Sequence, residues 1–262
     1  MSGGSLTVVG TGYKIGGHIT VESLAQIRLA EKVLANVNPV THEWLVQLNP
    51  ATESLSDCYA VGKDRSKTYR QMVDRILSHV RAGRRVCAVF YGHPGVACDP
   101  GQGAVKKARK EGFAARMLPG VSAEDCLFAD LGIDPSDGCQ HLEATMFLLS
   151  RFRVDVTRPV ILWQIAAVGV DTSYPTSEVW SRHAFNLLLE KLIRTYSPRH
   201  RVFLYEASPF PIIDPIIRRV SLRKLATMRI TSSSTLYIPS LREAEIDKKM
   251  MARLNAGSDI NG

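Results

Sequence analysis

Residues 86–96 (VCAVFYGHPGV) carry the strongest fold signal in this chain of 262 residues. The first six of them form an unbroken apolar run, which is typical of a central parallel strand covered on both faces. Gly92, Pro94 and Gly95 then predict a tight turn where that strand ends. Because ligands of open α/β sheets bind at the carboxyl ends of the strands, this turn, with Tyr91 and His93 on it, is the first candidate site.

Further strand and helix patterns alternate on both sides of this segment. Strands are expected at residues 6–9, 86–91, 115–118, 159–169, 202–206 and 235–239, and helices at 23–33, 69–80, 104–112, 185–196 and directly after Ser122. A change in composition near 132–138 separates two such series. The pattern therefore predicts an α/β fold with two lobes, residues 1–120 and 121–240, followed by a charged helix and tail at 241–262.

Composition limits the class of protein. Lys and Arg number 33 and Asp and Glu number 25, which gives a formal net charge of +8 and a sequence pI of about 9.4. The shares of hydrophobic residues (45%) and charged residues (22%) are those of a globular protein. No apolar run reaches the ~20 residues of a membrane span, and the start lacks a signal peptide. Five scattered cysteines without a C-x-x-C pair indicate a reduced, cytoplasmic chain without a structural zinc ion.

The loop Gly10-Thr11-Gly12 follows the first expected strand and is a second candidate site. As a dinucleotide fingerprint it is imperfect, because the third glycine comes one residue late for G-x-G-x-x-G. A tight turn is the simpler interpretation, in which the glycines show only that the backbone approaches another group closely. An NAD-dependent oxidoreductase stays open as an alternative.

Two further segments are candidates for binding and catalysis. Residues 118–123 (LPGVSA) lead a strand into a helix N-terminus, where free N–H groups can hold a carboxylate or hydroxyl. If Arg65 lies in the first turn of a helix, Arg65 and Tyr69 share one helix face. A guanidinium beside phenols can stabilise an oxyanion or favour a phenolate, although a solvated basic helix edge is the competing interpretation. Hydrolase, zinc-protease and P-loop motifs are absent from the sequence, which favours group transfer on a bound organic cofactor.

Taken together, these segments resemble the tetrapyrrole methylases. The resemblance rests on the GTG loop, YGHPGV at 91–96, LPGVSAEDCLFADLGIDP at 118–135, PVILWQIAAVGV at 159–170 and STLYIP at 234–239. It covers roughly residues 5–240 and implies a two-lobed methyltransferase with S-adenosyl-L-methionine in the cleft between the lobes. FYGHPGV, the long 118–135 segment and TYRQM at 68–72 resemble most one branch, the borosin α-N-methyltransferases. That branch methylates peptide-bond nitrogens of a ribosomally made precursor.

The resemblance also implies roles for particular residues. The implied cofactor-binding residues are Tyr91, His93, Val96, Ser122, Ala123, Gln164, Tyr205 and Thr235. The implied catalytic residues are Arg65, Tyr69 and Tyr59, the last in place of one of two upstream tyrosines of that branch. Arg65 is expected to hold the negative charge that develops near the carbonyl oxygen and to lower the pKa of a neighbouring phenol. Tyr69 or Tyr59 is expected to accept the amide proton or to hydrogen-bond the amide.

The resemblance bears on partners as well. The fungal members carry their substrate on the same chain, whereas this sequence stops at Gly262 after a short charged tail. We therefore expect a separate precursor as the substrate, methylated in trans, and a homodimer or a heterotetramer with that precursor. Substrate access as an extended strand also predicts an architecture that encloses the cleft.

Other functions remain open at this stage. Within the same fold, the alternatives are a methylase of precorrin, of ribosomal RNA or of diphthine. Basic residues cluster at 62–85 and 193–230, each with eight basic and two acidic residues. Base-stacking aromatic residues are not interleaved there and no nucleic-acid motif is present, so neither nucleic acid nor membrane is expected as a partner. An acidic segment of the precursor would complement this charge.

Overall fold

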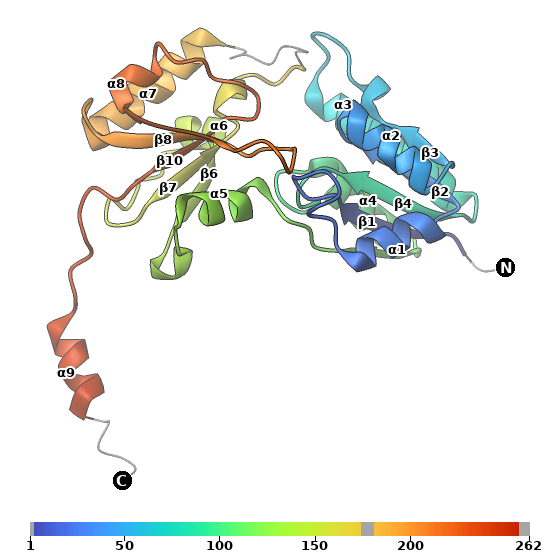
Figure 1. The fold of residues 1–262 in the computed structure, drawn as a ribbon, viewed down its shortest axis with the longest axis horizontal. Helices are drawn as coiled ribbons and strands as arrows, with labels where there is room; N and C mark the ends of the chain where they lie inside the picture. Colours follow the sequence, from blue (N-terminus) through green and yellow to red (C-terminus); the bar gives the residue numbers. More distant parts are fainter. Residues whose placement is uncertain (1–2, 174–180, 257–262) are drawn as a thin grey trace.

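A computed structural model describes residues 3–173 and 181–256, which form two α/β lobes lying side by side (Figure 1). The first lobe contains a parallel sheet of five strands in the order β3-β2-β4-β1-β5. The second contains a mixed sheet of five strands in the order β6-β7-β10-β8-β9. The α/β fold with two lobes expected from the sequence is thus confirmed, while the division of the chain at residue 120 stays a prediction.

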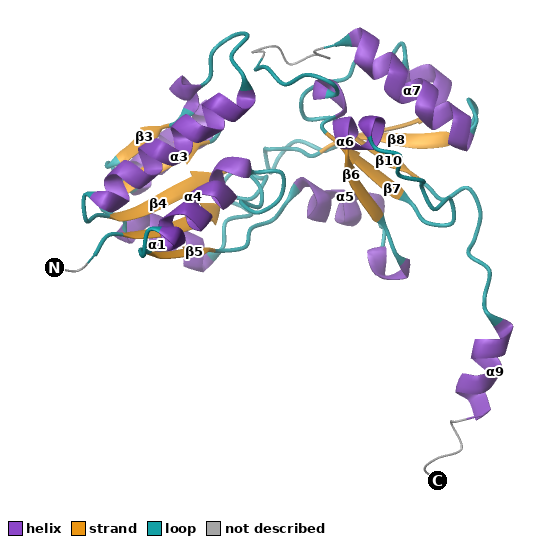
Figure 2. Ribbon diagram, turned by 180° about the vertical axis from the view of Figure 1, so that it is seen from behind, coloured by secondary structure: helices purple, strands orange, loops and turns teal. Residues whose placement is uncertain are grey.

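The first lobe is a sheet covered by helices on both faces. Its strands are β1 (Ser5–Gly10), β2 (Lys32–Asn36), β3 (Thr52–Ser54), β4 (Arg85–Phe90) and β5 (Ala114–Met117). Its helices are α1 (Val21–Leu29), α2 (Pro39–Leu48), α3 (Arg65–Arg81), α4 (Asp99–Lys110) and the short 3₁₀ turn η1 (Ser56–Cys58). Helices α3 and α4 lie side by side over one face (Figure 2). The continuous apolar run of β4 suits its central position, because both of its faces are buried.

The second lobe buries its sheet between α7 on one face and α5 on the other. Its strands are β6 (Gln140–Glu143), β7 (Val160–Trp163), β8 (Arg201–Glu206), β9 (Ile216–Ser221) and β10 (Thr235–Ile238). Its helices are α5 (Ala123–Leu131), α6 (Ala144–Leu149), α7 (Arg182–Tyr196) and α8 (Leu222–Leu225), with 3₁₀ turns η2 (Pro135–Asp137) and η3 (Ile165–Ala167).

Two expected elements differ from the structure. The helix expected at 23–33 ends at Leu29, and Val33 belongs to β2, where it pairs with β3 and β4. A short apolar run does not by itself distinguish a helix from a buried strand, and here the neighbouring strands decide. The strand expected at 159–169 ends at Trp163. Gln164 takes a left-handed conformation (φ 56°) and the chain continues as η3.

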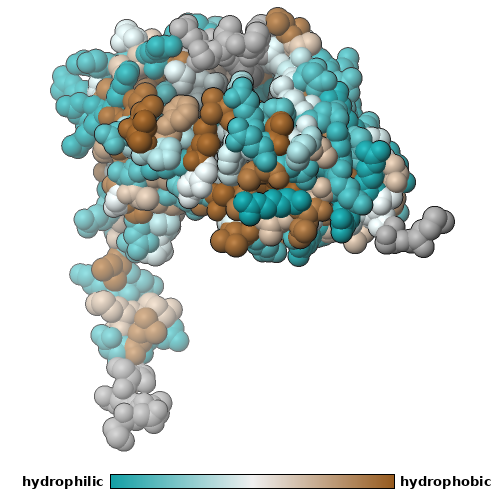
Figure 3. All heavy atoms as spheres, turned by 45° about the vertical axis from the view of Figure 1, so that its right-hand side comes forward, coloured by the Kyte–Doolittle hydropathy of each residue, from teal (hydrophilic) through white to brown (hydrophobic). Residues whose placement is uncertain are grey.

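The charged segment after residue 240 contains the expected helix, α9 (Lys248–Ala256). This helix lies apart from both lobes, and Figure 3 shows hydrophobic residues on it. The tail predicted beyond it, residues 257–262, lies outside the described residues. Among the helices that the structure describes, none combines the length and apolar character that a membrane crossing would need.

Candidate active site

A cavity of about 960 Å³, open to solvent, lies between the two lobes at the carboxyl ends of β2, β4 and β7. Most of the residues that the sequence singled out lie on its wall. These are Tyr59, Tyr69, Tyr91, His93, Val96, Ser122, Ala123, Gln164 and Thr235. Arg65 lines an adjoining hollow that shares Tyr69 with this cavity. The structure therefore brings together residues that are up to 176 positions apart in the sequence (Tyr59 and Thr235), although their roles stay predictions.

Three glycine-containing loops meet at Gly92, which lines the cavity. Gly12 and Gly92 exchange backbone hydrogen bonds, with N···O distances of 3.2 and 2.9 Å. A Cβ atom on Gly10 would lie 2.1 Å from the carbonyl oxygen of Gly92, and one on Gly120 would lie 2.8 Å from it. The group that the first glycine loop approaches is therefore the turn after β4. This packing explains the glycines without a dinucleotide.

The turn after β4 presents apolar surface to the cavity. Tyr91 is 58% exposed, Val96 42% and Tyr59 39%, and all three line the cavity. Exposed apolar surface gathered in a hollow indicates a site that a ligand covers. His93 differs from these residues, because its side chain is engaged within the turn: its Nδ1 accepts a hydrogen bond from the backbone N–H of Gly95 at 2.9 Å.

Ser122 is the N-cap of α5, the helix expected directly after it, and forms a capping box with Asp125. Its hydroxyl accepts the backbone N–H groups of Glu124 and Asp125 and donates to Asp125 Oδ2 at 2.8 Å. These contacts use the donor and both acceptor sites of the hydroxyl. A ligand that contacts Ser122 would therefore have to do so through atoms other than the hydroxyl.

Two non-glycine residues on the cavity wall adopt left-handed backbone conformations. They are Ala97, with φ 48°, and Gln164, with φ 56°. Such conformations cost roughly 1–3 kcal/mol each and cluster at binding sites, where the surrounding structure enforces them. Gln164 ends β7 and turns the chain along the cavity, which is why the expected strand stops there.

Arg65 is the first residue of α3, so the expectation that it lies in a first helical turn is confirmed. The carboxylate of Asp64 caps this helix by accepting the backbone N–H of Lys67 at 3.1 Å. The backbone N–H of Arg65 donates to the carbonyl oxygen of Asp171 at 2.9 Å. Because Asp171 follows η3, the second lobe fixes the start of the helix that carries Arg65 and Tyr69.

A second contact between the lobes lies at the opposite end of the cleft. The backbone N–H of Ile15 donates to the carbonyl oxygen of Pro209 at 2.9 Å. Pro209 lines a hollow that shares Tyr13, Tyr59 and Tyr91 with the main cavity. The cleft thus continues past the main cavity in two directions, toward Arg65 and toward Pro209.

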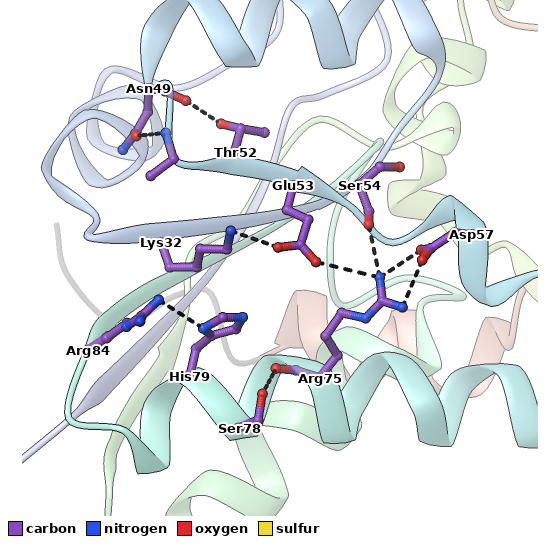
Figure 4. A network of polar contacts seen from close by, with 11 residues as sticks. Lys32, Asn49, Thr52, Glu53, Ser54, Asp57, Arg75, Ser78, His79 and Arg84 are labelled. Carbon is purple, nitrogen blue, oxygen red and sulfur yellow. Dashed lines mark hydrogen bonds and ion pairs between the residues drawn. The ribbon is translucent and has the colours of Figure 1, made fainter.

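Polar contacts fasten the segment that carries Tyr59 to α3 (Figure 4). The guanidinium of Arg75 binds Asp57 through two hydrogen bonds, Nη1–Oδ1 at 2.7 Å and Nη2–Oδ2 at 2.8 Å. Its Nη1 also donates to the carbonyl oxygen of Ser54 at 3.2 Å. On the other side of Tyr59, Lys63 Nζ donates to the carbonyl oxygen of Cys58 and to the side chain of Gln71 in α3. Tyr59 is therefore held relative to the helix that bears Arg65 and Tyr69.

The ionisation of the two phenols differs from the sequence-based expectation. Burial raises the pKa of Tyr69 to about 12; Tyr59 adds to this rise and the positive charge of Arg65 opposes it. Burial likewise raises the pKa of Tyr59, against a hydrogen bond that its hydroxyl accepts from Asn36 and the charge of Arg65. Arg65 thus lowers the pKa of both phenols, as expected, but burial outweighs this effect and the net direction is upward. Both phenols are neutral near pH 7.

Tyr205 lies in the core of the second lobe and is not among the residues that line the cavity. Its side chain is fully buried beside Leu127 and Tyr237, and its hydroxyl donates to Asp130 Oδ2 at 2.7 Å. Burial, followed by this hydrogen bond, raises its pKa. Strand alternation turns this side chain toward α5 and away from the cavity wall, while its expected role in cofactor binding stays a prediction.

Sequence reasoning missed several residues of the cavity wall. They include Tyr13, Asn36, Trp163 and the serines 232–234. Tyr13 follows the GTG loop and Trp163 precedes Gln164 in a segment already singled out, so their neighbours offered a signal. Asn36 ends β2, which the sequence analysis did not recognise as a strand.

Comparison with known proteins gives a consistent family. Residues 5–208 match the family model of Tetrapyrrole (Corrin/Porphyrin) Methylases. A methyltransferase/ribosomally synthesized cyclic peptide gymnopeptides precursor of Gymnopus fusipes is 40% identical over 257 residues, which cover 96% of this chain and 61% of that protein. The methyltransferase/omphalotin A precursor of Omphalotus olearius is 39% identical over 242 residues, 90% of this chain and 58% of that protein. The chain spans about six tenths of the length of these relatives.

Solved structures share the fold at low sequence identity. Uroporphyrin-III-C-methyltransferase from Thermus thermophilus superposes with a TM-score of 0.65 at 18% identity, covering 91% of this chain and 95% of that one. Diphthine synthase superposes with a TM-score of 0.58 at 15% identity, covering 90% of each chain. At such identities the likeness extends to the fold alone.

Proposed function

This chain belongs to the tetrapyrrole (corrin/porphyrin) methylases, and we propose that it is a methyltransferase that methylates backbone amide nitrogens of a peptide with S-adenosyl-L-methionine. One observation carries the proposal. Arg65, Tyr69 and Tyr59 gather beside an aromatic cavity in a chain about 40% identical to proteins named as both methyltransferase and cyclic peptide precursor. The proposal assigns the cavity to the cofactor and the adjoining Arg65 hollow to the peptide.

The cavity suits S-adenosyl-L-methionine in its chemistry. Six aromatic side chains line it: Tyr13, Tyr59, Tyr69, Phe90, Tyr91 and Trp163. Aromatic faces stack on an adenine ring and attract a cation such as a sulfonium. Tyr91, Val96, Gln164 and Thr235 would hold the cofactor, which supplies an electrophilic methyl group when bound.

Methylation of an amide needs help from the protein, because the nitrogen lone pair is delocalised into the carbonyl group. As the amide N–H proton leaves, negative charge develops on the carbonyl oxygen. The guanidinium of Arg65 can stabilise this charge, an effect that typically changes a rate by roughly 10²–10³ for one donor. The proton can pass from the amide nitrogen to the phenol oxygen of Tyr69 once that phenol is ionised, or to solvent. Because the pKa of Tyr69 is about 12, the fraction of ionised Tyr69, and with it the rate of this proton transfer, increases as the pH rises.

We also propose that the peptide belongs to a separate precursor chain and that the enzyme works as a homodimer. The described residues are compatible with the first part, because α9 lies away from the cavity and leaves the cleft open to a peptide. The relatives named above join enzyme and precursor in one chain, so methylation in cis is the competing arrangement. Light scattering of the purified protein tests the homodimer.

The proposed reaction is tested by co-expressing the chain with each small open reading frame beside its gene and measuring intact masses of both products. A second chain that gains multiples of one methyl group, located on backbone nitrogen by fragmentation, supports the proposal. Methylation of this chain alone would support cis action and contradict a separate precursor. Arg65→Ala serves as the control and should abolish the increments while calorimetric binding of S-adenosyl-L-methionine persists. Transfer to uroporphyrinogen but to no peptide would overturn the proposed substrate class.

A further inference from the structure

The second sheet has a free edge at β9. This strand is last in the sheet order and pairs with β8 alone among the described strands. Its first four residues are exposed, including Ile216 at 43% and Ile217 at 40%. Since successive side chains of a strand point to opposite faces, β9 exposes apolar surface on both faces as well as its outer backbone edge.

The loop before β9 enlarges this apolar surface. Phe210 is 37% exposed, Ile212 95% and Ile213 53%. Five large apolar side chains are thus exposed within residues 210–217. An exposed apolar strand at a sheet edge is a ready template for a further strand.

The charge of β9 indicates what kind of chain would pair with it. Arg218 and Arg219 lie in the middle of the strand, and no carboxylate in the described part of the chain forms an ion pair with either of them. The guanidinium of Arg219 lies 5.8 Å from the ring centroid of Phe203. Antiparallel pairing of β9 with β9 of a second copy would set these arginines against each other, and like charges in facing strands are destabilising. The edge therefore favours an acidic partner over a second copy.

The position of β9 connects this edge to the cleft. Ile216, the first residue of β9, pairs with Glu206, the last residue of β8. Directly after Glu206, the chain continues through Ala207 to Pro209. Ala207 and Pro209 line the hollow that continues into the main cavity. A chain paired along β9 would leave the sheet beside this hollow and would already be extended, as a backbone amide must be to meet the site.

We propose that β9 is the docking strand for an extended segment of the precursor in which two neighbouring apolar residues are followed by two neighbouring acidic residues, because each face of β9 carries one isoleucine and one arginine. The segment would add to the second sheet beyond β9 and direct the residues that follow it into the cleft. Backbone hydrogen bonds would supply affinity, and the isoleucines and arginines would supply selectivity. The inference rests on the proposed peptide substrate, and it names the part of the precursor that the enzyme holds.

The test uses a short fluorescent peptide in which pairs of valines and pairs of glutamates follow one another, so that glutamates lie on both faces of the strand, with lysines in place of the glutamates for comparison. Anisotropy should show binding of the acidic peptide alone, weakening as salt is added. Hydrogen–deuterium exchange should slow at the amides of β9 when the acidic peptide binds. The double variant Arg218→Glu/Arg219→Glu should weaken binding about tenfold or more, since two attractive charge pairs become repulsive.

Lys106→Glu/Lys110→Glu provides a matched charge reversal on α4, where both lysines are exposed, and it should leave affinity unchanged. Equal loss in both double variants, or binding without slower exchange at β9, would overturn the docking strand. So would a change from dimer to monomer caused by the arginine variant in light scattering, because a second copy would then cover the edge. Capture of the probe at β9 by an enzyme that methylates no peptide would count against the proposed function and leave the docking strand supported.

Discussion

Replacing Tyr205 by phenylalanine removes one hydroxyl and should lower stability without weakening cofactor binding. The side chain is fully buried and the hydroxyl donates to Asp130 Oδ2 at 2.7 Å. A hydrogen bond to a charged group contributes about 1.5–3 kcal/mol. Asp130 is exposed, so water can solvate its carboxylate in the variant, which places the loss near the lower value. A loss of about 1.5 kcal/mol lowers the melting temperature by roughly 3–6 °C in a protein of this size.

Tyr196→Phe is the matched control, because it deletes the same atom from a side chain that is 1% exposed in the same lobe. Its hydroxyl has no hydrogen-bond partner among the described residues. Removing a buried, unpaired hydroxyl should leave stability unchanged or raise it by about 1 kcal/mol. Burial raises the pKa of Tyr196 to about 12, so ionisation of the unfolded chain destabilises the wild type as the pH rises from about 10 toward 12. Tyr196→Phe should reduce this alkaline loss.

Differential scanning calorimetry at pH 7 and isothermal titration with S-adenosyl-L-methionine measure both effects. We expect Tyr205→Phe to melt several degrees lower than Tyr196→Phe, with cofactor affinity within about twofold of the wild type. The opposite pattern, an unchanged melting temperature with cofactor binding weakened tenfold, would refute the reasoning. Tyr205 would then belong to the cofactor site, as the family resemblance implied.

Three further predictions concern the cavity. If the phenolate of Tyr69 takes the proton, kcat/KM should rise about tenfold per pH unit between pH 7 and 10, because the pKa of Tyr69 is about 12. The variant Tyr69→Phe should then show a flat pH profile. A flat profile for the wild-type enzyme would exclude this role of Tyr69. Asp57→Asn should lower kcat about tenfold or more, because it loosens the segment that positions Tyr59. Its effect on the free energy of unfolding should stay under about 1 kcal/mol, because the ion pair between Asp57 and Arg75 is partly exposed. An unchanged kcat would show that this contact does not position Tyr59. Gln164→Gly should raise stability by up to about 1 kcal/mol in thermal unfolding by relieving its left-handed backbone, and a lower melting temperature would contradict this.

Much of the fold could be predicted because local and tertiary preferences agree. The apolar run of β4 has both faces covered, and the helix expected directly after Ser122 begins there, capped by the Ser122 side chain. The failures arose where tertiary contacts override a local pattern. Val33 continues a helical spacing in sequence but pairs between strands, and Gln164 ends an apolar run because the chain turns along the cavity.

The site was predictable in so far as it lies at strand ends. Tyr91 and His93 follow a recognisable strand, whereas Asn36 follows one that the sequence did not reveal. The contact between Asp57 and Arg75 joins residues with no local pattern that links them. The pKa of Tyr69 depends mainly on burial, which arises only when the lobes and loops pack, so residue types alone indicated the lowering by Arg65 but not the larger rise caused by burial.

The central claim is methyl transfer to peptide backbone nitrogen with the participation of Arg65. The most direct measurement is fragmentation mass spectrometry of the precursor after reaction with S-adenosyl-L-methionine and either the wild-type enzyme or Arg65→Ala. We expect methyl groups on backbone amides with the wild-type enzyme and none with the variant, while the variant still binds the cofactor. Methyl groups on side chains alone, or equal backbone methylation by Arg65→Ala, would contradict it.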